Sequence, residues 1–167
     1  MTMKIVRSLI SCIKGAAAAE MALVTPLLII IMFGAFEAGN FFWSQQIIGK
    51  AVRDGARFAG RRPFTDYVGC TPSTSVINDT RNVTLTGRIS GGTARIANWT
   101  DATTVTVSMP GGCNTTYSGG IYTNNLGGAP TVTVTATVPY NSLFGNLGFT
   151  TTNLAMSADA HAAVMGF

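Results

Sequence analysis

A carboxylate near the start of a long apolar segment is the feature with the clearest chemical consequence. Glu20 follows Gly15 and four consecutive alanines, and stands inside an apolar run that extends to Phe42. A charged carboxylate in hydrocarbon is costly unless it is protonated or paired, so an acid inside a membrane segment indicates a functional site. The alternative is that Glu20 marks the membrane interface and extends its side chain to water. Both interpretations depend on the element that carries this residue.

That element is predicted to be a transmembrane helix. Residues 16–42 read AAAAEMALVTPLLIIIMFGAFEAGNFF, which is about the length needed to cross a hydrocarbon core of ~30 Å. Polar and apolar residues then alternate at helical spacing, which predicts that the helix leaves the membrane and becomes amphipathic. It should end near Gly60, where Arg61, Arg62 and Pro63 supply a stop. Pro26 lies inside this helix and favours a kink.

Small residues and a second acid lie in the outer half of the apolar run. Gly34 with Ala38, and Ala35 with Gly39, stand four positions apart and would let another helix approach closely. Apolar segments rich in small residues also contain such pairs by chance, and both interpretations remain open. Glu37 either pairs with a basic group on another subunit or lies at the membrane interface, and we favour the interface.

Basic residues lie on both sides of the apolar run. They account for the formal net charge of +4, although only 11% of the residues are charged, against about 25% in ordinary soluble domains. Charge counting therefore does not orient the helix. Four charged residues after the run are three or four positions apart and can share ion pairs along one solvated face: Lys50, Arg53, Asp54 and Arg57.

Beyond Pro63 the sequence predicts a small antiparallel sheet. Residues 103–109 and 131–138 alternate valine with threonine, as half-buried strands do. Residues 154–165 are predicted to form a last strand, because a stable sheet needs three or more. Residues 73–86 favour a short helix that ends at Gly87, with a strand over 83–89 as the alternative, and residues 110–130 read as a long loop. The predicted fold class is therefore α+β, a long transmembrane and amphipathic helix followed by this sheet.

Two cysteines beyond the helix are predicted to form a disulfide. Cys70 and Cys113 would both face an oxidising envelope compartment, where such a bond persists. On the chain-entropy model a loop of this length stabilises the fold by about 4 kcal/mol. Two free thiols are the alternative, although exposed free cysteine is a liability outside the cytoplasm.

The start of the chain resembles a type IV prepilin processing site. A short basic leader precedes Gly15, the apolar helix follows it, and Glu20 would be the fifth residue of a mature chain. The resemblance implies that a membrane aspartyl peptidase cuts between Gly15 and Ala16. Cleavage creates an ammonium group at Ala16, and Glu20 of a neighbouring subunit would be its negative partner.

Further motifs resemble the TadE-like family, minor pseudopilins of the tight-adherence pilus. The likeness covers about Gly15 to Gly60. Each motif alone is a weak signal, and only the combination of the motifs is specific. Family members often have leucine or valine after the second glutamate, whereas this chain has Phe36 before Glu37 and alanine after it. Ala22, followed by Leu23, replaces the aliphatic residue usual two positions after Glu20, and neither change removes a group that the peptidase needs. The motifs are Pro26-Leu-Leu, Phe33-Gly34-Ala-Phe-Glu37-Ala-Gly39 and Ala51-Val-Arg53-Asp54-Gly55-Ala-Arg57-Phe-Ala59.

The resemblance implies a domain organisation, a location and partners. Residues 1–15 would be the leader, 16–60 the transmembrane and amphipathic helix, and 61–167 a pilin-like periplasmic domain on the bacterial inner membrane. The implied partners are the prepilin peptidase, the major pilin, a sister pseudopilin and the inner-membrane assembly platform. The implied function is assembly of a tight-adherence type IV pilus, which supports surface adhesion and biofilm formation.

Several alternatives remain. An unprocessed single-pass envelope protein would carry the same β-rich head as an adhesive or interaction domain. A tip adhesin would use Tyr117 and Tyr122 of the long loop. A lipoprotein would be acylated at Cys12, but the apolar stretch before this residue is too short for a signal sequence. A secreted protein with a cleaved signal peptide lacks a good cleavage point after the span.

The sequence gives little basis for an enzyme. It contains one histidine, His161, which we interpret as a strand residue in polar surroundings. Paired carboxylates outside the helix, ligand clusters and phosphate-binding glycine loops are not recognisable, so we expect no catalytic residue, metal or cofactor. A basic face interleaved with aromatic residues is also missing, so nucleic acid is not an expected partner.

Overall fold

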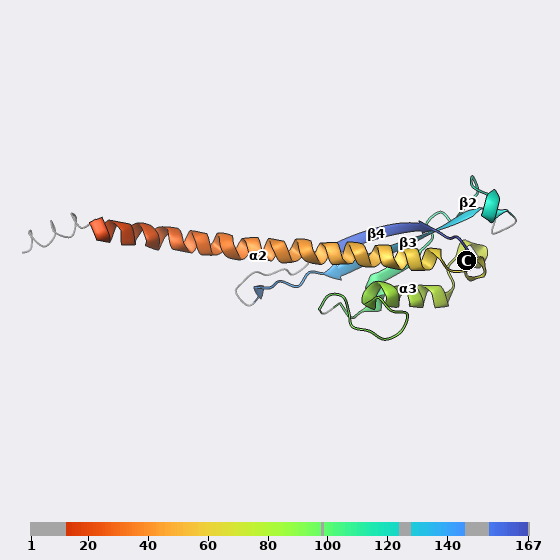
Figure 1. Ribbon diagram of the computed structural model, residues 1–167, viewed down its shortest axis with the longest axis horizontal. Helices are drawn as coiled ribbons and strands as arrows, with labels where there is room; N and C mark the ends of the chain where they lie inside the picture. Colours follow the sequence, from red (N-terminus) through yellow and green to blue (C-terminus); the bar gives the residue numbers. More distant parts are fainter. Residues whose placement is uncertain (1–12, 98, 124–127, 146–153, 167) are drawn as a thin grey trace, which may run out of the picture. The chain divides into compact units, whose positions relative to one another are not determined.

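The α+β class is confirmed by the structure, a computed structural model that describes residues 13–97, 99–123, 128–145 and 154–166 (Figure 1). Cys12 and the leader before Ile13 lie outside the described residues. The long helix α2 spans Ile13–Gly60, and α3 spans Thr74–Thr86. Three short 3₁₀ helices connect the elements: η1 (Phe64–Cys70), η2 (Ala102–Thr104) and η3 (Gly120–Tyr122). The strands are β1 (Val105–Ser108), β2 (Cys113–Asn114), β3 (Ala129–Pro139) and β4 (Ala155–Ala163).

Helix α2 continues without interruption through Pro26. The hydroxyl of Thr25 donates to the carbonyl oxygen of Met21 at 2.6 Å in the same turn, which adds a side-chain hydrogen bond beside the missing proline N–H. The helix ends at Gly60, as predicted. The chain divides into two compact units, Met1–Asn40 and Phe41–Phe167.

The sheet is organised around β3, which pairs antiparallel with each of the other described strands. Val107 stands opposite Val134 in the β1–β3 pair, and Thr133 stands opposite His161 in the β3–β4 pair. The predicted alternation is present, because the valines of β1 and β3 are buried while Thr106, Thr131 and Thr137 are exposed. Thr133 differs and is buried as well. The last predicted strand is confirmed as β4.

The segment expected as one long loop is partly ordered into elements. It contains η3 and β2, and β3 begins at Ala129 rather than at Thr131. Cys113 and Asn114 pair with Pro130 and Ala129, and this pairing extends β3 beyond its valine alternation. A two-residue strand has no periodicity, so the sequence pattern did not reveal it.

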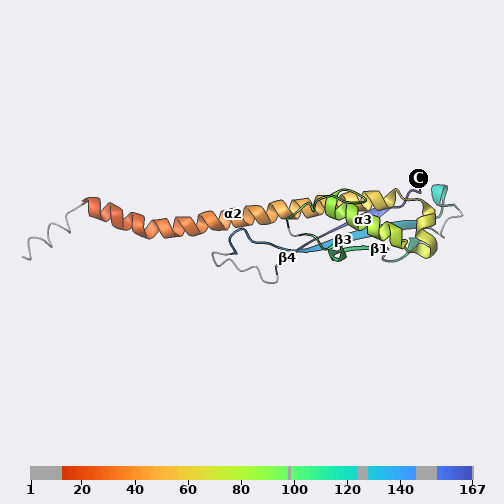
Figure 2. The ribbon, with the colours of Figure 1, turned by 90° about the horizontal axis from the view of Figure 1, so that it is seen from below.

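Helix α3 has the boundaries that the sequence favoured, and the alternative strand over residues 83–89 is wrong. Val76 N–H donates to the hydroxyl oxygen of Ser73 at 3.3 Å, which caps the first turn. Gly87 adopts a left-handed conformation with φ of 80° and donates its N–H to the carbonyl of Val83, a conformation that favours glycine. The helix packs against β1 (Figure 2).

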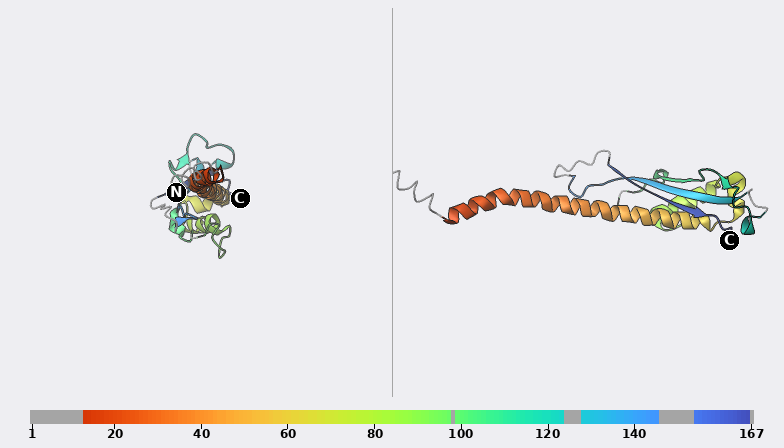
Figure 3. Two further views of the ribbon diagram at one scale, coloured as in Figure 1. Left: turned by 90° about the vertical axis from the view of Figure 1, so that its left-hand side faces the viewer. Right: turned by 90° about the horizontal axis from the view of Figure 1, so that it is seen from above.

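The core of the second unit joins the C-terminal part of α2 to the sheet, and Figure 3 shows this part of α2 running alongside the strands. Gln45 donates from Nε2 to the carbonyl of Ser157 at 2.8 Å, and Met165 N–H donates to the carbonyl of Gly60 at 2.8 Å. These bonds hold β4 and the chain after it along α2. Buried apolar residues from five elements fill the space between them: Ile48, Ala51, Val52, Ala56 and Ala59 of α2; Val76 and Leu85 of α3; Val105 and Val107 of β1; Val132, Val134, Ala136 and Val138 of β3; Met156 and Ala160 of β4.

Candidate functional site

The N-terminal part of α2 is an apolar surface that the described chain leaves uncovered. None of its most apolar 18-residue window is buried, and among the described residues it is the one helix long and apolar enough to cross a membrane. Leu23 is 80% exposed and Ile30 is 64% exposed. A surface of this size is stable in hydrocarbon or against other helices rather than in water. The helix is therefore compatible with a single-pass membrane protein.

The predicted processing residues lie at the start of this helix. Gly15, Ala16 and Glu20 are all exposed. A Cβ atom built on Gly15 meets no atom within 4 Å, so the described chain itself does not require glycine there. Ala16 and Glu20 are four residues apart, and residues at this spacing share one face of a helix. The geometry leaves both residues accessible to another protein.

The glycines of the outer half of the apolar run also lie in open space. Cβ atoms at Gly34 and Gly39 would meet nothing within 4 Å. Neither glycine is needed for a close approach within the described chain. A requirement for glycine at these positions would have to come from another molecule. Glu37, between them, is partly buried.

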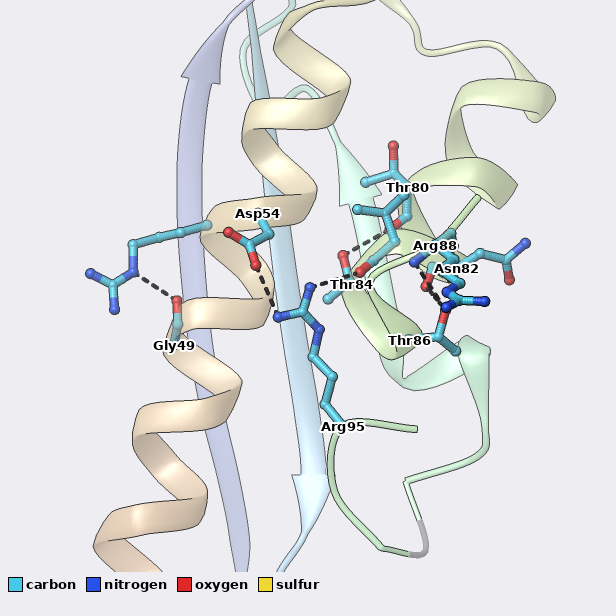
Figure 4. A network of polar contacts seen from close by, with 10 residues as sticks. Gly49, Asp54, Thr80, Asn82, Thr84, Thr86, Arg88 and Arg95 are labelled. Carbon is cyan, nitrogen blue, oxygen red and sulfur yellow. Dashed lines mark hydrogen bonds and ion pairs between the residues drawn. The ribbon is translucent and has the colours of Figure 1, made fainter. Parts of the chain in front are cut away.

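The charged residues after the apolar run do not form the expected ion pairs with one another. Asp54 instead accepts a hydrogen bond from Nη1 of Arg95 at 2.9 Å, and Nε of Arg53 donates to the carbonyl of Gly49 in its own helix at 2.9 Å. Lys50, Arg53 and Arg57 are exposed, as a solvated face requires. Asp54 differs because its side chain is directed toward the segment that follows α3 (Figure 4).

Arg95 bridges α2 and the C-terminal end of α3. Its Nη2 donates to the carbonyl of Val83 at 3.4 Å, and its backbone N–H donates to the carbonyl of Leu85 at 3.0 Å. A cation at this end of a helix is favoured by the helix dipole. Sequence reasoning missed this residue, since its surroundings are rich in Gly, Ser and Thr and show no periodicity.

Gly55 lies at a close approach between α2 and α3. A Cβ atom at this position would overlap the side-chain hydroxyl of Thr84, which donates to the carbonyl of Thr80 at 2.8 Å. Glycine is therefore needed here for packing within the second unit. Two adjacent residues of the α2 motif, Asp54 and Gly55, thus hold α3 and its following segment against the long helix.

A disulfide joins Cys70 and Cys113, the pair expected from the sequence. Their Cα atoms are 5.4 Å apart, within the range that a disulfide spans. The bond ties the end of η1 to β2. The rings of Phe64 and Tyr122 lie 5.8 Å apart in an edge-to-face arrangement and connect η1 to η3.

His161 lies on β4 in polar surroundings, as interpreted from the sequence. Its Nδ1 is 2.7 Å from the hydroxyl oxygen of Thr133, and its Nε2 is 3.1 Å from Oδ2 of Asp159. The side chains of His161 and Asp159 are 60% and 62% exposed, so water screens their interaction. In the ranges that the structure describes, no group of three or more His, Cys, Asp or Glu residues could hold a metal ion.

A comparison with known families confirms the resemblance found in the helix. The model of the family described as TadE-like protein matches residues 15–57, which lie within α2. No curated protein matches the chain, and no solved structure does. The match indicates a function related to the tight-adherence pilus, and pilus-associated proteins of this kind are not typically enzymes. It extends over the uncovered apolar run and the Asp54 and Gly55 contacts.

Proposed function

We propose that the chain is a prepilin-like minor pilin, or pseudopilin, that takes part in assembly of a tight-adherence type IV pilus. In this proposal α2 anchors the protein in the bacterial inner membrane, the leader faces the cytoplasm, and residues 61–167 lie in the periplasm. The observation that carries the proposal is the coincidence of the TadE-like match over residues 15–57 with an apolar helix that the chain leaves uncovered.

Processing between Gly15 and Ala16 would turn this membrane helix into an assembly element. The prepilin peptidase would remove the leader and create an ammonium group at Ala16. A carboxylate that would be costly in hydrocarbon then gains a partner, because Glu20 of one subunit pairs with the new amine of its neighbour. The exposure of Gly15, Ala16 and Glu20 supports this role.

Subunit packing would then cover the rest of the apolar run. The open space at Gly34 and Gly39 fits close approach by helices of the major pilin or of a sister pseudopilin. The inner-membrane assembly platform would extract the processed subunit from the membrane.

Pilus assembly in cells tests this function. Glu20→Gln should leave the protein in the membrane fraction and reduce surface pili to near the level of a strain that lacks the chain, because the amide cannot pair with an ammonium group as a carboxylate does. Met21→Leu, a volume-conserving change on the adjacent exposed residue, is the matched control and should retain pili. Wild-type pili in the Glu20→Gln strain would contradict the proposal.

A tip adhesin is a second candidate function, favoured by apolar exposure in the second unit. Val68, Tyr117 and Ile121 are 74%, 65% and 57% exposed. Tyr117→Ser with Ile121→Ser should leave pilus number unchanged under both functions. Loss of surface attachment with normal pili would identify an adhesin. Normal attachment would contradict the adhesin function and leave assembly as the function that the data support.

A further inference from the structure

Four basic side chains form a row along the C-terminal part of α2 and the residue just after it. We call Lys50, Arg53, Arg57 and Arg61 the basic ridge. Their spacing of three, four and four residues places them on one face of a helix, and all four are exposed. At a rise of about 1.5 Å per residue, the row extends over about 16 Å.

The basic ridge has no acidic partner in the part of the chain that the structure describes. Other arginines nearby are paired, since Arg62 lies 3.1 Å from Asp66 and Arg95 lies 2.9 Å from Asp54. No ion pair joins any ridge residue to an acid of the described ranges. Four like charges in a row repel one another, so a bound anionic surface would stabilise them.

Two surface hollows adjoin the basic ridge, and Arg57 lines both of them. The first is lined by Gln46, Lys50, Arg53, Asp54 and Arg57. The second is lined by Arg57, Gly60, Arg61, Ala162, Ala163 and Met165. An elongated ligand lying along the helix would therefore contact all four cations and enter both hollows.

A second copy of this chain does not offer a complementary surface. Its seven acidic residues are separated from one another by at least a dozen positions in the sequence. A second copy could supply single carboxylates, but the four cations need a row of them.

Lipid headgroups would reach only the beginning of the basic ridge. Lys50 is eight residues and Arg61 nineteen residues beyond Phe42, the end of the apolar run. These separations correspond to about 12 Å and about 28 Å along a helix, whereas the headgroup region on each side of a bilayer is only about 5–8 Å thick. Measured along the helix, Arg57 and Arg61 therefore lie farther from the end of the apolar run than the headgroup region extends.

We propose that the basic ridge docks a row of acidic side chains on a different protein subunit, either one face of a helix or an extended acidic segment. The proposed function enters this inference at one point, where it identifies the acidic subunit as a component of the pilus assembly. The binding itself requires neither removal of the leader nor pairing of Glu20.

Binding of designed peptides to the full-length protein in phosphatidylcholine nanodiscs tests the proposal. The probe is a fluorescent helical peptide with glutamates at spacings of three, four and four residues, and its control has the same composition in scrambled order. Combined Lys50→Gln, Arg53→Gln, Arg57→Gln and Arg61→Gln should weaken binding of the matched peptide at least about tenfold. Arg57→Gln alone should weaken it measurably, whereas Arg88→Gln, at another exposed arginine, should not.

Three results would overturn the proposal. The first is equal binding of the matched peptide to the wild type and to the fourfold variant. The second is equal binding of the matched and scrambled peptides to the wild type. The third is loss of peptide binding when phosphatidylglycerol replaces part of the neutral lipid at constant ionic strength, since lipid would then occupy the basic ridge. The proposed pilin function is tested separately: it would be contradicted by a protein that keeps its leader in cells, whatever the outcome of the peptide binding.

Discussion

Gly55 of α2 lies so close to Thr84 of α3 that no side chain fits between them. The preceding residue, Asp54, pairs with Arg95 from the segment after α3. Both α2 residues belong to the part of the chain that matches the TadE-like family. This part of the matched segment therefore holds the second unit together, while the apolar run before it is uncovered in the described chain.

Gly55→Ala should destabilise the second unit by about 1–3 kcal/mol, the usual effect of overpacking. This is expected even though alanine has a higher helix propensity than glycine. The added methyl group would displace the Thr84 hydroxyl, which is buried and bonded to the carbonyl of Thr80. Chemical denaturation of the full-length protein in detergent measures this change.

Gly49→Ala is the matched control, because a Cβ there meets only Nη2 of Arg53, at 3.8 Å. It should leave stability unchanged or raise it by up to about 1 kcal/mol. In a double-mutant cycle, Thr84→Ala should remove most of the effect of Gly55→Ala. Additive effects of the two substitutions would contradict the packing account.

Asp54→Asn should lower the free energy of unfolding by about 1–2 kcal/mol, since it removes the charge from a partly buried, charge-assisted hydrogen bond. Arg95 would keep its contacts with the end of α3 but lose its anchor on α2. A denaturation series with Asp54→Ala, Arg95→Ala and the double variant isolates the pair energy. Arg53→Gln should have little effect, because its Nε bonds only to a carbonyl of its own helix. A coupling energy near zero would show that Asp54 and Arg95 are independent.

Cys70→Ser with Cys113→Ser should reduce stability by about 4 kcal/mol on the chain-entropy model, because the bond closes a loop with a sequence separation of 43. The wild type should lose a similar amount in reducing agent, whereas the double variant should not respond to it. Thermal unfolding with and without reductant measures both effects. A wild-type Tm that is insensitive to complete reduction would contradict a stabilising role for this bond.

The stability of the second unit should fall above about pH 10, the pKa of an unperturbed tyrosine. Burial, and then the negative charge of Asp66, raise the pKa of Tyr67 above this value, while Arg62 acts in the opposite direction. The unfolded chain then releases the phenol proton before the folded chain does, so the free energy of unfolding decreases as pH rises, by up to about 1.4 kcal/mol per unit.

Tyr67→Phe should remove this part of the pH dependence between about pH 10 and pH 12. The variant should also lose about 1 kcal/mol at neutral pH, because the Tyr67 hydroxyl donates to the carbonyl of Ala59 at 2.6 Å. Denaturation curves at several alkaline pH values test both expectations. An unchanged alkaline slope in Tyr67→Phe would assign the effect to other groups.

Local patterns in the sequence predicted the elements of this fold well. The unbroken apolar run and the stop after Gly60 define α2, and the valine alternation defines the central parts of β1 and β3. Gly87 has the residue type that ends helices, so the end of α3 could be located, although the same segment also allowed a strand over residues 83–89. In each case neighbours in the sequence carry the signal.

Contacts between distant segments could not be predicted in the same way. Asp54 and Arg95 are 41 residues apart. Basic residues closer to Asp54 in the sequence, on the same helix, suggested other partners for this carboxylate. Gly55 was recognised as part of a motif, yet its neighbour Thr84 lies on another element. The short strand β2 forms because it pairs with the start of β3. Its two residues are too few to show the alternation of buried and exposed side chains that identifies a strand in a sequence. These features depend on how the elements pack.

The N-terminus of the mature protein tests the central claim most directly. The full-length protein should be isolated from membranes of cells that contain the prepilin peptidase and analysed by N-terminal sequencing and intact mass. The account predicts a chain that begins at Ala16, and a Gly15→Leu variant, which the open space at this position accommodates, that keeps its leader. A wild-type chain that keeps residues 1–15 in these cells would contradict the account and leave an unprocessed membrane anchor with a β-rich head.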